Sequence, residues 1–284
     1  MFILLEGKPI AEKIKTALAA EIAMLKTKHG KSPKLVALQI GDNASSAVYV
    51  KAQKKAAESI GIEYELKMLP QDLSQSEVEN VISDLNKDIS TSAVILQMPV
   101  PKGIDPKILV NMIAPGKDAE GMHPENLGKI LSGQYRIAPC TAMAVMELLE
   151  STGIKLYGKE VVVVGHSEIV GKPLSIMLLN KFATTTVCHI ATGERGTLPD
   201  HVKRAEVLIV AVGKAGVVKG EWIKDGAIVI DVGINKVGDK IVGDVEFESA
   251  AKKASYITPV PGGVGPLTTT ILMRNAMEQF KAKL

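Results

Sequence analysis

The stretch that decides the fold is VVVVGHSEIVGKP, residues 161–173. Four consecutive valines predict a parallel strand that is buried on both faces. Gly165 ends this strand, and Gly171 enters the helix that is expected to follow. Glycine at these two places lets the backbone approach a pyrophosphate, and a helix N-terminus offers free N–H groups and the positive end of its dipole. The stretch therefore predicts a strand, a turn and a helix that bind a dinucleotide.

The spacing of this turn departs from the G-x-G-x-x-G pattern. Ser167 replaces the middle glycine, and Gly171 comes one residue late. On this motif alone, a tight turn without a ligand is the alternative. Two more apolar runs, residues 207–212 and 228–232, are each followed by a glycine. Because glycines at several strand ends leave room over the carboxyl edge of a parallel sheet, they favour the cofactor site.

The end of the next expected strand bears on the choice of cofactor. A fold that prefers NAD often carries an acidic residue there, on the ribose hydroxyls. Residues 187–190 are Val-Cys-His-Ile and contain no carboxylate. That absence removes a repulsion against a 2′-phosphate, which His166, His189 or Arg195 could approach, although solvated loop side chains are the alternative for each. We therefore expect NADP, with NAD possible.

Helical periods alternate with short apolar runs along the chain, which predicts an α/β architecture. In the first half we expect helices at 9–28, 44–60 and 76–87 and strands at 35–40, 62–68 and 93–97. In the second half we expect helices at 141–152, 170–182 and 266–281, strands at 160–164, 184–188, 207–212 and 227–232, and a hairpin within 234–245. The join between two domains is expected near residues 128–139.

Composition excludes several classes of protein. With 46% hydrophobic residues in 284, the chain can bury a large core and is not disordered. A net charge of +3 gives no electrostatic footprint for nucleic acid. Cys140 and Cys188 fit no metal-ligand spacing and are expected to be reduced thiols. No apolar run approaches the ~18 residues of a membrane helix, and Glu6 interrupts the start too soon for a signal peptide. We expect a cytoplasmic protein without nucleic-acid, membrane or metal partners.

One face of the helix at 44–60 carries polar side chains that suit a site. Ser46, Tyr49 and Gln53 fall on that face, at helical spacing. The stripe of Val48, Ala52, Ala56 and Ile60 is expected to face the core. Packing against the core is the alternative reading for Tyr49.

Two further segments of the first half carry candidate site residues. Gln97 ends a buried strand before two prolines, so its amide is expected to reach a cleft. Asp118 and Glu120 place carboxylates near the same rim, although exposed acids of a loop are usually only solvated.

Several segments of the chain match one known family in order and spacing. They are Tyr49-Val50, QMPVP at 97–101, KDAEGMHP at 117–124, the turn at 165–173, DVGIN at 231–235 and PVPGGVGP at 259–266. Over essentially its whole length the chain resembles the bifunctional methylenetetrahydrofolate dehydrogenase/methenyltetrahydrofolate cyclohydrolases, the FolD family. The last of these segments is highly specific.

The resemblance implies a fold and an activity. A folate-binding catalytic domain would comprise residues 1–138, with the C-terminal helix at 267–284 packing back on it. A Rossmann-like NAD(P)-binding domain would comprise residues 139–266, with the active site in the cleft between the domains of a homodimer. Such enzymes move a hydride from 5,10-methylenetetrahydrofolate to NADP. They then hydrolyse the methenyl product to 10-formyltetrahydrofolate, in one-carbon metabolism and purine biosynthesis.

Roles carry over position by position from that resemblance. Tyr49 matches the tyrosine beside the pterin, Gln97 matches the glutamine of the site, and Glu120 stands where the family has an aspartate on the pterin edge. The positions that match the loop lining the folate are Pro261, Gly262 and Gly263. Those expected to contact the cofactor are Gly165, His166, Ser167, Gly171, Ile190 and Ile234.

One position departs from the family. The catalytic lysine of the family lies four residues after the tyrosine, and here that position is Gln53. A glutamine amide forms hydrogen bonds but exchanges no proton near neutral pH. We therefore expect a dehydrogenase whose cyclohydrolase step is impaired. The alternatives are a fully bifunctional enzyme that uses Lys54 or water to carry protons, and a folate- and nucleotide-binding protein without turnover.

Overall fold

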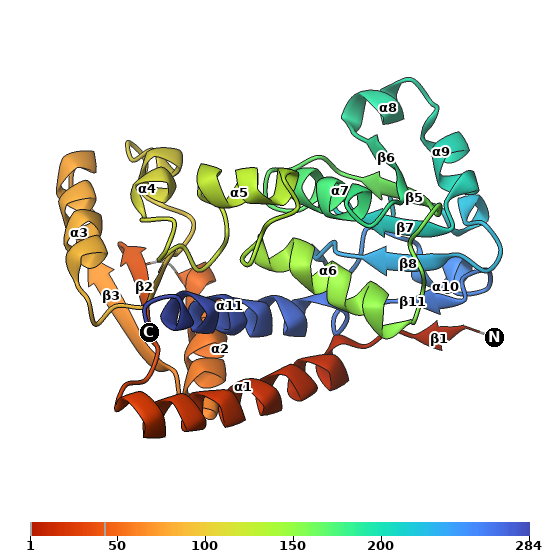
Figure 1. Ribbon diagram of the computed structural model, residues 1–284. Helices are drawn as coiled ribbons and strands as arrows, with labels where there is room; N and C mark the ends of the chain where they lie inside the picture. Colours follow the sequence, from red (N-terminus) through yellow and green to blue (C-terminus); the bar gives the residue numbers. More distant parts are fainter. Residues whose placement is uncertain (1, 43) are drawn as a thin grey trace. The chain divides into compact units, whose positions relative to one another are not determined.

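Six parallel strands form the larger sheet of the computed structural model (Figure 1), which describes residues 2–42 and 44–284. Their order across the sheet is β1-β11-β8-β7-β5-β6. The strands are β1 (Ile3–Leu4), β5 (Glu160–Val164), β6 (Thr184–Cys188), β7 (Val207–Val210), β8 (Ile228–Asp231) and β11 (Tyr256–Ile257). The chain runs from β5 outward to β6 and then crosses back to β7. Open α/β sheets bind ligands at such a reversal, outside the carboxyl ends of the strands.

Short helices and one hairpin complete this half of the chain. The helices are α7 (Gly171–Leu179), α8 (Ile190–Glu194), α9 (Leu198–Arg204), the 3-10 helix η1 (Gly220–Trp222) and α10 (Phe247–Ala250). Strands β9 (Asn235–Val237) and β10 (Lys240–Val242) pair antiparallel, which confirms the expected hairpin. Val162, Leu208 and Val229 lie side by side in one core, and Val163, Ile209 and Ile230, which point to the opposite face, are buried as well, so these strands are covered on both faces.

A smaller parallel sheet, in the order β3-β2-β4, organises the other half of the chain (Figure 1). Its strands are β2 (Lys34–Ile40), β3 (Glu63–Leu69) and β4 (Ala93–Leu96), and its helices are α2 (Ala44–Ile60), α3 (Gln75–Lys87), α4 (Pro106–Met112) and α5 (Pro124–Leu131). Val36, Ile82 and Leu109 lie in the core. A parallel bridge from Val94 to Asp118 fixes the segment after α4 beside β4.

The chain divides into two compact units. The N-terminal unit comprises Lys13–Cys140 and Thr269–Leu284, and the C-terminal unit comprises Thr141–Thr268 with the described residues up to Glu12. Three helices, α1 (Gly7–His29), α6 (Cys140–Ser151) and α11 (Val264–Lys281), continue across these divisions. The first residues differ from the expected domain of 1–138, because β1 pairs with β11. Most of the last helix, from Thr269 on, belongs to the N-terminal unit.

Most expected elements form where the sequence places them. The helix at 44–60 and the strands at 160–164 and 184–188 have the expected bounds. The helix expected at 170–182 ends at Leu179, and short helices such as α4 and α8 were not anticipated. Both cysteines are free and buried. Within residues 2–42 and 44–284, no helix is long and apolar enough to cross a membrane.

Candidate functional site

The turn after β5 has no room for side chains at its two glycines. Gly165 has a φ of +119°, and a Cβ at this position would overlap the carbonyl oxygen of Ala211. A Cβ on Gly171 would overlap the carbonyl oxygen of Gly165. The turn therefore passes directly against the end of β7, at the reversal of the sheet. This closeness leaves backbone, rather than side chains, at the place where a pyrophosphate would bind.

Ser167 shapes the entry into α7. Its hydroxyl accepts a hydrogen bond of 3.1 Å from the N–H of Val170, and its carbonyl accepts one of 3.0 Å from the N–H of Lys172. Val170 at the N-cap supplies no side-chain hydrogen bond to the helix. The start of α7 is thus ordered by the preceding turn, while no side chain caps its first N–H groups.

A pocket of ≈ 850 Å³ opens over this turn. Its lining comprises Val164, Gly165, His166, Ser167, His189, Ile190, Gly193, Glu194, Gly196, Leu198, Pro199, Ala211, Val212, Lys214, Val217 and Trp222. The rings of His166 and His189 lie 5.2 Å apart at its wall. The volume is in the range of cofactor pockets, and its polar groups suit phosphate. The residues present therefore fit a dinucleotide, with the side chains of His166, His189 and Lys214 as those that could meet a 2′-phosphate.

Two buried aspartates hold the loops around this pocket. Asp244 accepts hydrogen bonds from the backbone N–H groups of Val212, Gly213 and Lys214 at 2.7, 2.9 and 2.9 Å. Asp231 accepts hydrogen bonds from the N–H groups of Gly233, Asp244 and Val245. Burial raises the pKa of Asp231 to about 6. Sequence reasoning did not assign these residues a role, although Asp231 opens the DVGIN segment and Asp244 directly follows Gly243.

Ile234 lies in the segment that this aspartate pair supports. The side chain is 57% exposed, and it follows Gly233, where a Cβ would overlap the carboxylate of Asp244. Its role as a cofactor contact remains a prediction, because Ile234 does not line the pocket over the turn.

The buried face of α2 differs from the one expected. Val48 is 73% exposed and Ala52 is exposed, so the prediction that they face the core is wrong. Ser46, Val50 and Gln53 are buried instead, in line with Ala57 and Ile60 at steps of three or four residues. Gln53 can occupy this face because neighbouring polar groups satisfy its amide oxygen.

Gln53, Gln97 and Tyr64 form the polar centre of the N-terminal unit. The Oε1 atom of Gln53 accepts a hydrogen bond of 2.9 Å from Nε2 of Gln97 and one of 3.0 Å from the hydroxyl of Tyr64. Gln97 directly follows β4 and Tyr64 lies on β3, the two strands that flank β2. The structure therefore brings two of the sequence-predicted site residues together and adds a tyrosine that the motifs did not reveal.

Tyr49 and Lys54 occupy different surroundings on the same helix. Tyr49 lies one turn before Gln53 and is 61% exposed, so it is not a core tyrosine. The Nζ atom of Lys54 is 3.8 Å from a carboxylate oxygen of Glu58, and both side chains are more than half exposed. Lys54 therefore lies on the solvent side of α2, away from the face that buries Gln53.

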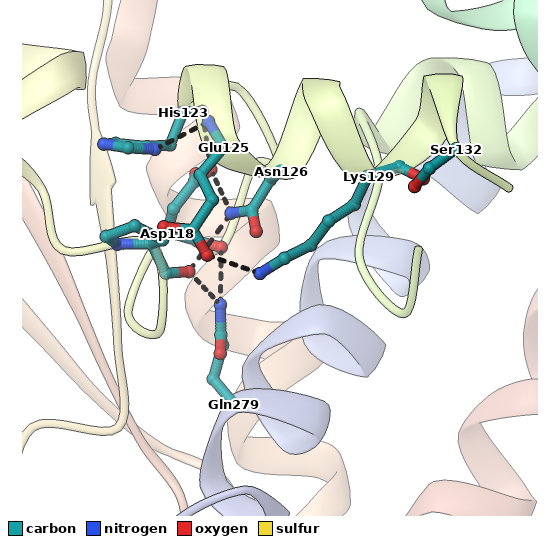
Figure 2. Close-up of polar contacts among 8 residues, drawn as sticks. Asp118, His123, Glu125, Asn126, Lys129, Ser132 and Gln279 are labelled. Carbon is teal, nitrogen blue, oxygen red and sulfur yellow. Dashed lines mark hydrogen bonds and ion pairs between the residues drawn. The ribbon is translucent and has the colours of Figure 1, made fainter. Parts of the chain in front are cut away.

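A buried carboxylate organises the loop that carries Glu120 (Figure 2). Asp118 accepts hydrogen bonds from the N–H groups of Glu120 and Gly121 at 3.1 and 2.9 Å. It also accepts hydrogen bonds from the N–H of His123 at 2.8 Å and from Nδ2 of Asn126 at 3.0 Å, two residues labelled in Figure 2. The carbonyl of Asp118 accepts a further hydrogen bond from Gln279 of α11. Asp118 is thus a structural acid of this loop.

Glu120 is the unusual acid of this loop. Burial raises the pKa of Glu120 to about 8, and the nearby negative charge of Asp118 adds to the rise. At neutral pH Glu120 is therefore mainly a neutral carboxylic acid, which can donate a hydrogen bond as well as accept one.

The loop of Pro261, Gly262 and Gly263 belongs to the C-terminal unit. Pro261 and Gly262 are exposed, while Gly263 is buried. The carbonyl of Gly262 accepts a hydrogen bond of 3.0 Å from the N–H of Gly7, and a Cβ on Gly7 would overlap the carbonyl oxygen of Gly263. The start of α1 therefore fixes the backbone of this loop. Its contact with folate remains a prediction.

Family models and known structures account for the whole arrangement. Residues 5–120 match the catalytic domain of tetrahydrofolate dehydrogenase/cyclohydrolase, and residues 139–284 match its NAD(P)-binding domain. The bifunctional protein FolD of a Nitratiruptor species is 44% identical over 280 residues, covering 99% of this chain and 98% of the relative.

Two solved structures have the same fold. The bifunctional enzyme FolD of Campylobacter jejuni has a TM-score of 0.96 and 41% identity, with 100% of both chains covered. The Trypanosoma brucei FolD, solved with NADP cofactor and inhibitor, has a TM-score of 0.93 and 38% identity, covering 99% of this chain and 98% of that one. With two matched domains and full-length relatives, this chain belongs to the tetrahydrofolate dehydrogenase/cyclohydrolase family.

Proposed function

We propose that this chain oxidises 5,10-methylenetetrahydrofolate to 5,10-methenyltetrahydrofolate with NADP, and that it hydrolyses the methenyl product only slowly. Membership of the family, whose relatives are named as bifunctional enzymes, supports the dehydrogenase. The observation that carries the second part is the position of Gln53, buried and hydrogen-bonded to Gln97 and Tyr64. At that place the resembling family has a lysine.

For the dehydrogenase, the chain has to bind and orient two ligands. When bound, NADP supplies the nicotinamide ring that accepts the hydride. The glycine turn and the start of α7 would hold its pyrophosphate, while His166 and His189 stand where a 2′-phosphate could be met. Tyr49, Gln97 and Glu120 would hold the folate. Hydride transfer needs little beyond this positioning, because no proton is exchanged with the protein in the step itself.

For the hydrolysis, water must add to the methenyl carbon and a proton must be moved. The amide of Gln53 exchanges no proton near neutral pH, so it cannot replace an amine in that role. Lys54 is directed to solvent and pairs with Glu58, which argues against its taking over. Like a lysine, Gln53 can form hydrogen bonds, so we expect it to orient the substrate. Unlike a lysine, it cannot transfer a proton.

The two half-reactions test this proposal when they are timed separately on one sample, with NADP and with NAD. We expect methenyl formation in the parent protein, faster with NADP. Methenyl hydrolysis in the parent is expected to be slow, and hydrolysis far above the buffer background is expected only in a Gln53→Lys variant. Lys54→Gln is the matched control and should leave both rates of the parent unchanged.

Other outcomes separate the alternatives. Efficient hydrolysis by the parent protein would overturn the impairment. A parent protein that binds NADP and folate but produces no methenyl absorbance would be the binding protein without turnover.

We further propose that the protein is a homodimer in the cytoplasm, because the family resemblance implies this assembly and this location. A mass of one chain by light scattering at assay concentrations would contradict it.

A further inference from the structure

Tyr64 reaches Gln53 from the edge of the smaller sheet. It lies on β3, at the level of Leu35 of β2, and its hydroxyl is 3.0 Å from Oε1 of Gln53. Gln97 approaches the same oxygen from the far side of β2, at 2.9 Å. The two donors thus converge on one atom from opposite sides of the central strand.

This convergence fixes the orientation of the Gln53 amide. An amide oxygen has two lone pairs, and here each lone pair has its own donor. A half-turn flip of the Gln53 amide alone would place its NH₂ group against the Nε2 donor of Gln97, so the alternative orientation requires the Gln97 amide to flip as well and Tyr64 to accept instead of donate. With two donors on the oxygen, the two N–H bonds of Gln53 are available on the opposite side. Gln53 is 9% exposed, so solvent competes little for these positions.

The hydroxyl of Tyr64 stays protonated throughout the useful pH range. Burial raises the pKa of Tyr64 to about 12. The donor to Gln53 is therefore present whenever the protein is folded, and it needs no cation or anion nearby. A neutral donor of this kind suits the amide oxygen of Gln53, because that oxygen accepts hydrogen bonds and carries no charge.

We propose that Tyr64 is a positioning residue for the folate reaction. Together with Gln97 it locks the Gln53 amide so that Nε2 donates a hydrogen bond to an acceptor atom of the folate substrate. This inference rests on the proposed function, and it assigns a part in that site to a residue outside every motif of the sequence. Tyr64 acts only through Gln53, so its effect must disappear when the amide is removed.

A double-mutant cycle tests this dependence. Tyr64→Phe removes one oxygen and is expected to lower kcat/KM for methylenetetrahydrofolate about 5-fold, the worth of one hydrogen bond, with NADP affinity unchanged. In a Gln53→Ala background the same change is expected to cost nothing further. Tyr157→Phe, on an exposed tyrosine of the C-terminal unit, is the matched control and should match the parent.

Thermal unfolding of the four proteins separates positioning from packing. A role in packing alone would lower kcat/KM and the melting temperature equally in both backgrounds, and that result would overturn the proposal. An unchanged kcat/KM in Tyr64→Phe would also overturn it while leaving the dehydrogenase assignment intact. If the parent protein has no turnover, the proposed function fails first. The same cycle is then measured as folate affinity by calorimetry, where the coupling must still appear.

Discussion

The carboxylate of Asp244 accepts a 2.7 Å hydrogen bond from the backbone N–H of Val212, 32 residues earlier in the chain. The next two N–H groups, those of Gly213 and Lys214, bind the same carboxylate. Val212 and Lys214 line the pocket over the glycine turn, whereas Asp244 is fully buried and does not line it. A buried carboxylate outside the pocket therefore fixes the backbone of the pocket wall.

Asp244→Asn is expected to weaken NADP binding about 10-fold or more. The amide replaces one acceptor oxygen with a donor that faces backbone N–H groups, at a cost of ~1–3 kcal/mol for a buried polar group left unsatisfied. Calorimetry gives the dissociation constant for NADP, and folate affinity serves as the internal reference. Asp239→Asn, an exposed position in the β9–β10 turn, is the control. An Asp244→Asn variant that binds NADP like the parent would contradict a support role.

Gly171→Ala is expected to abolish measurable NADP binding and to lower the melting temperature. The added Cβ has to displace the backbone of the glycine turn, because it would overlap the carbonyl of Gly165. Gly193→Ala is the matched control, since Gly193 lines the same pocket but a Cβ there meets no atom within 4 Å. Equal affinities of these two variants for NADP would show that the close approach does not matter.

The raised pKa of Glu120 predicts the direction of a pH dependence. The folded protein keeps this proton up to a pH of about 8, whereas the pKa of an unperturbed glutamate is 4.5. Between these values the unfolded chain has lost a proton that the folded one retains, so the contribution of Glu120 to the free energy of unfolding falls as pH rises. Denaturant titrations of the parent and Glu120→Gln between pH 6 and 8 should show a steeper fall in the parent. Parallel slopes would mean that Glu120 ionises normally.

Gln53→Glu tests which end of the amide the substrate uses. A carboxylate can accept from both Tyr64 and Gln97, so the variant should still fold, with a melting temperature below that of the parent because a carboxyl group replaces a neutral amide at a buried position. The ionised side chain has no N–H group that could donate to the substrate, so we expect kcat/KM for the folate substrate to fall about 10-fold. This loss is larger than the loss of one neutral hydrogen bond would cause, because the substitution also adds a charge. Unaltered dehydrogenase kinetics would show that Gln53 serves as an acceptor instead.

Local signals in the sequence were sufficient for the elements that carry the site. The valine run of β5 forms a strand with the expected bounds, because a strand buried on both faces has to be apolar at every position. The helix α2 also has the expected bounds. The glycines of the turn after β5 are needed because a Cβ at Gly165 or Gly171 would overlap backbone atoms.

The face of α2 could not be read from its periodicity. Small and apolar residues occur all around this helix, so Val48 and Ala52 formed a plausible apolar stripe. The stripe that is buried contains Ser46 and Gln53, because Tyr64 on β3 and Gln97 after β4 supply hydrogen bonds to the amide oxygen. A buried polar group is stable only with such partners, and no local pattern shows that they will be present.

By itself, the sequence determined the family, the α/β class, the strand, turn and helix at 161–173 and the glutamine at position 53. Composition, periodicity and motifs of a few residues are sufficient to identify these features. Only the tertiary structure decided that Tyr64 joins Gln53, that Asp244 holds the loop at 212–214, and that the turn after β5 lies against the end of β7. Each of these contacts satisfies buried polar groups or fills space between segments that are tens of residues apart in the sequence. Such contacts form only when the chain is folded.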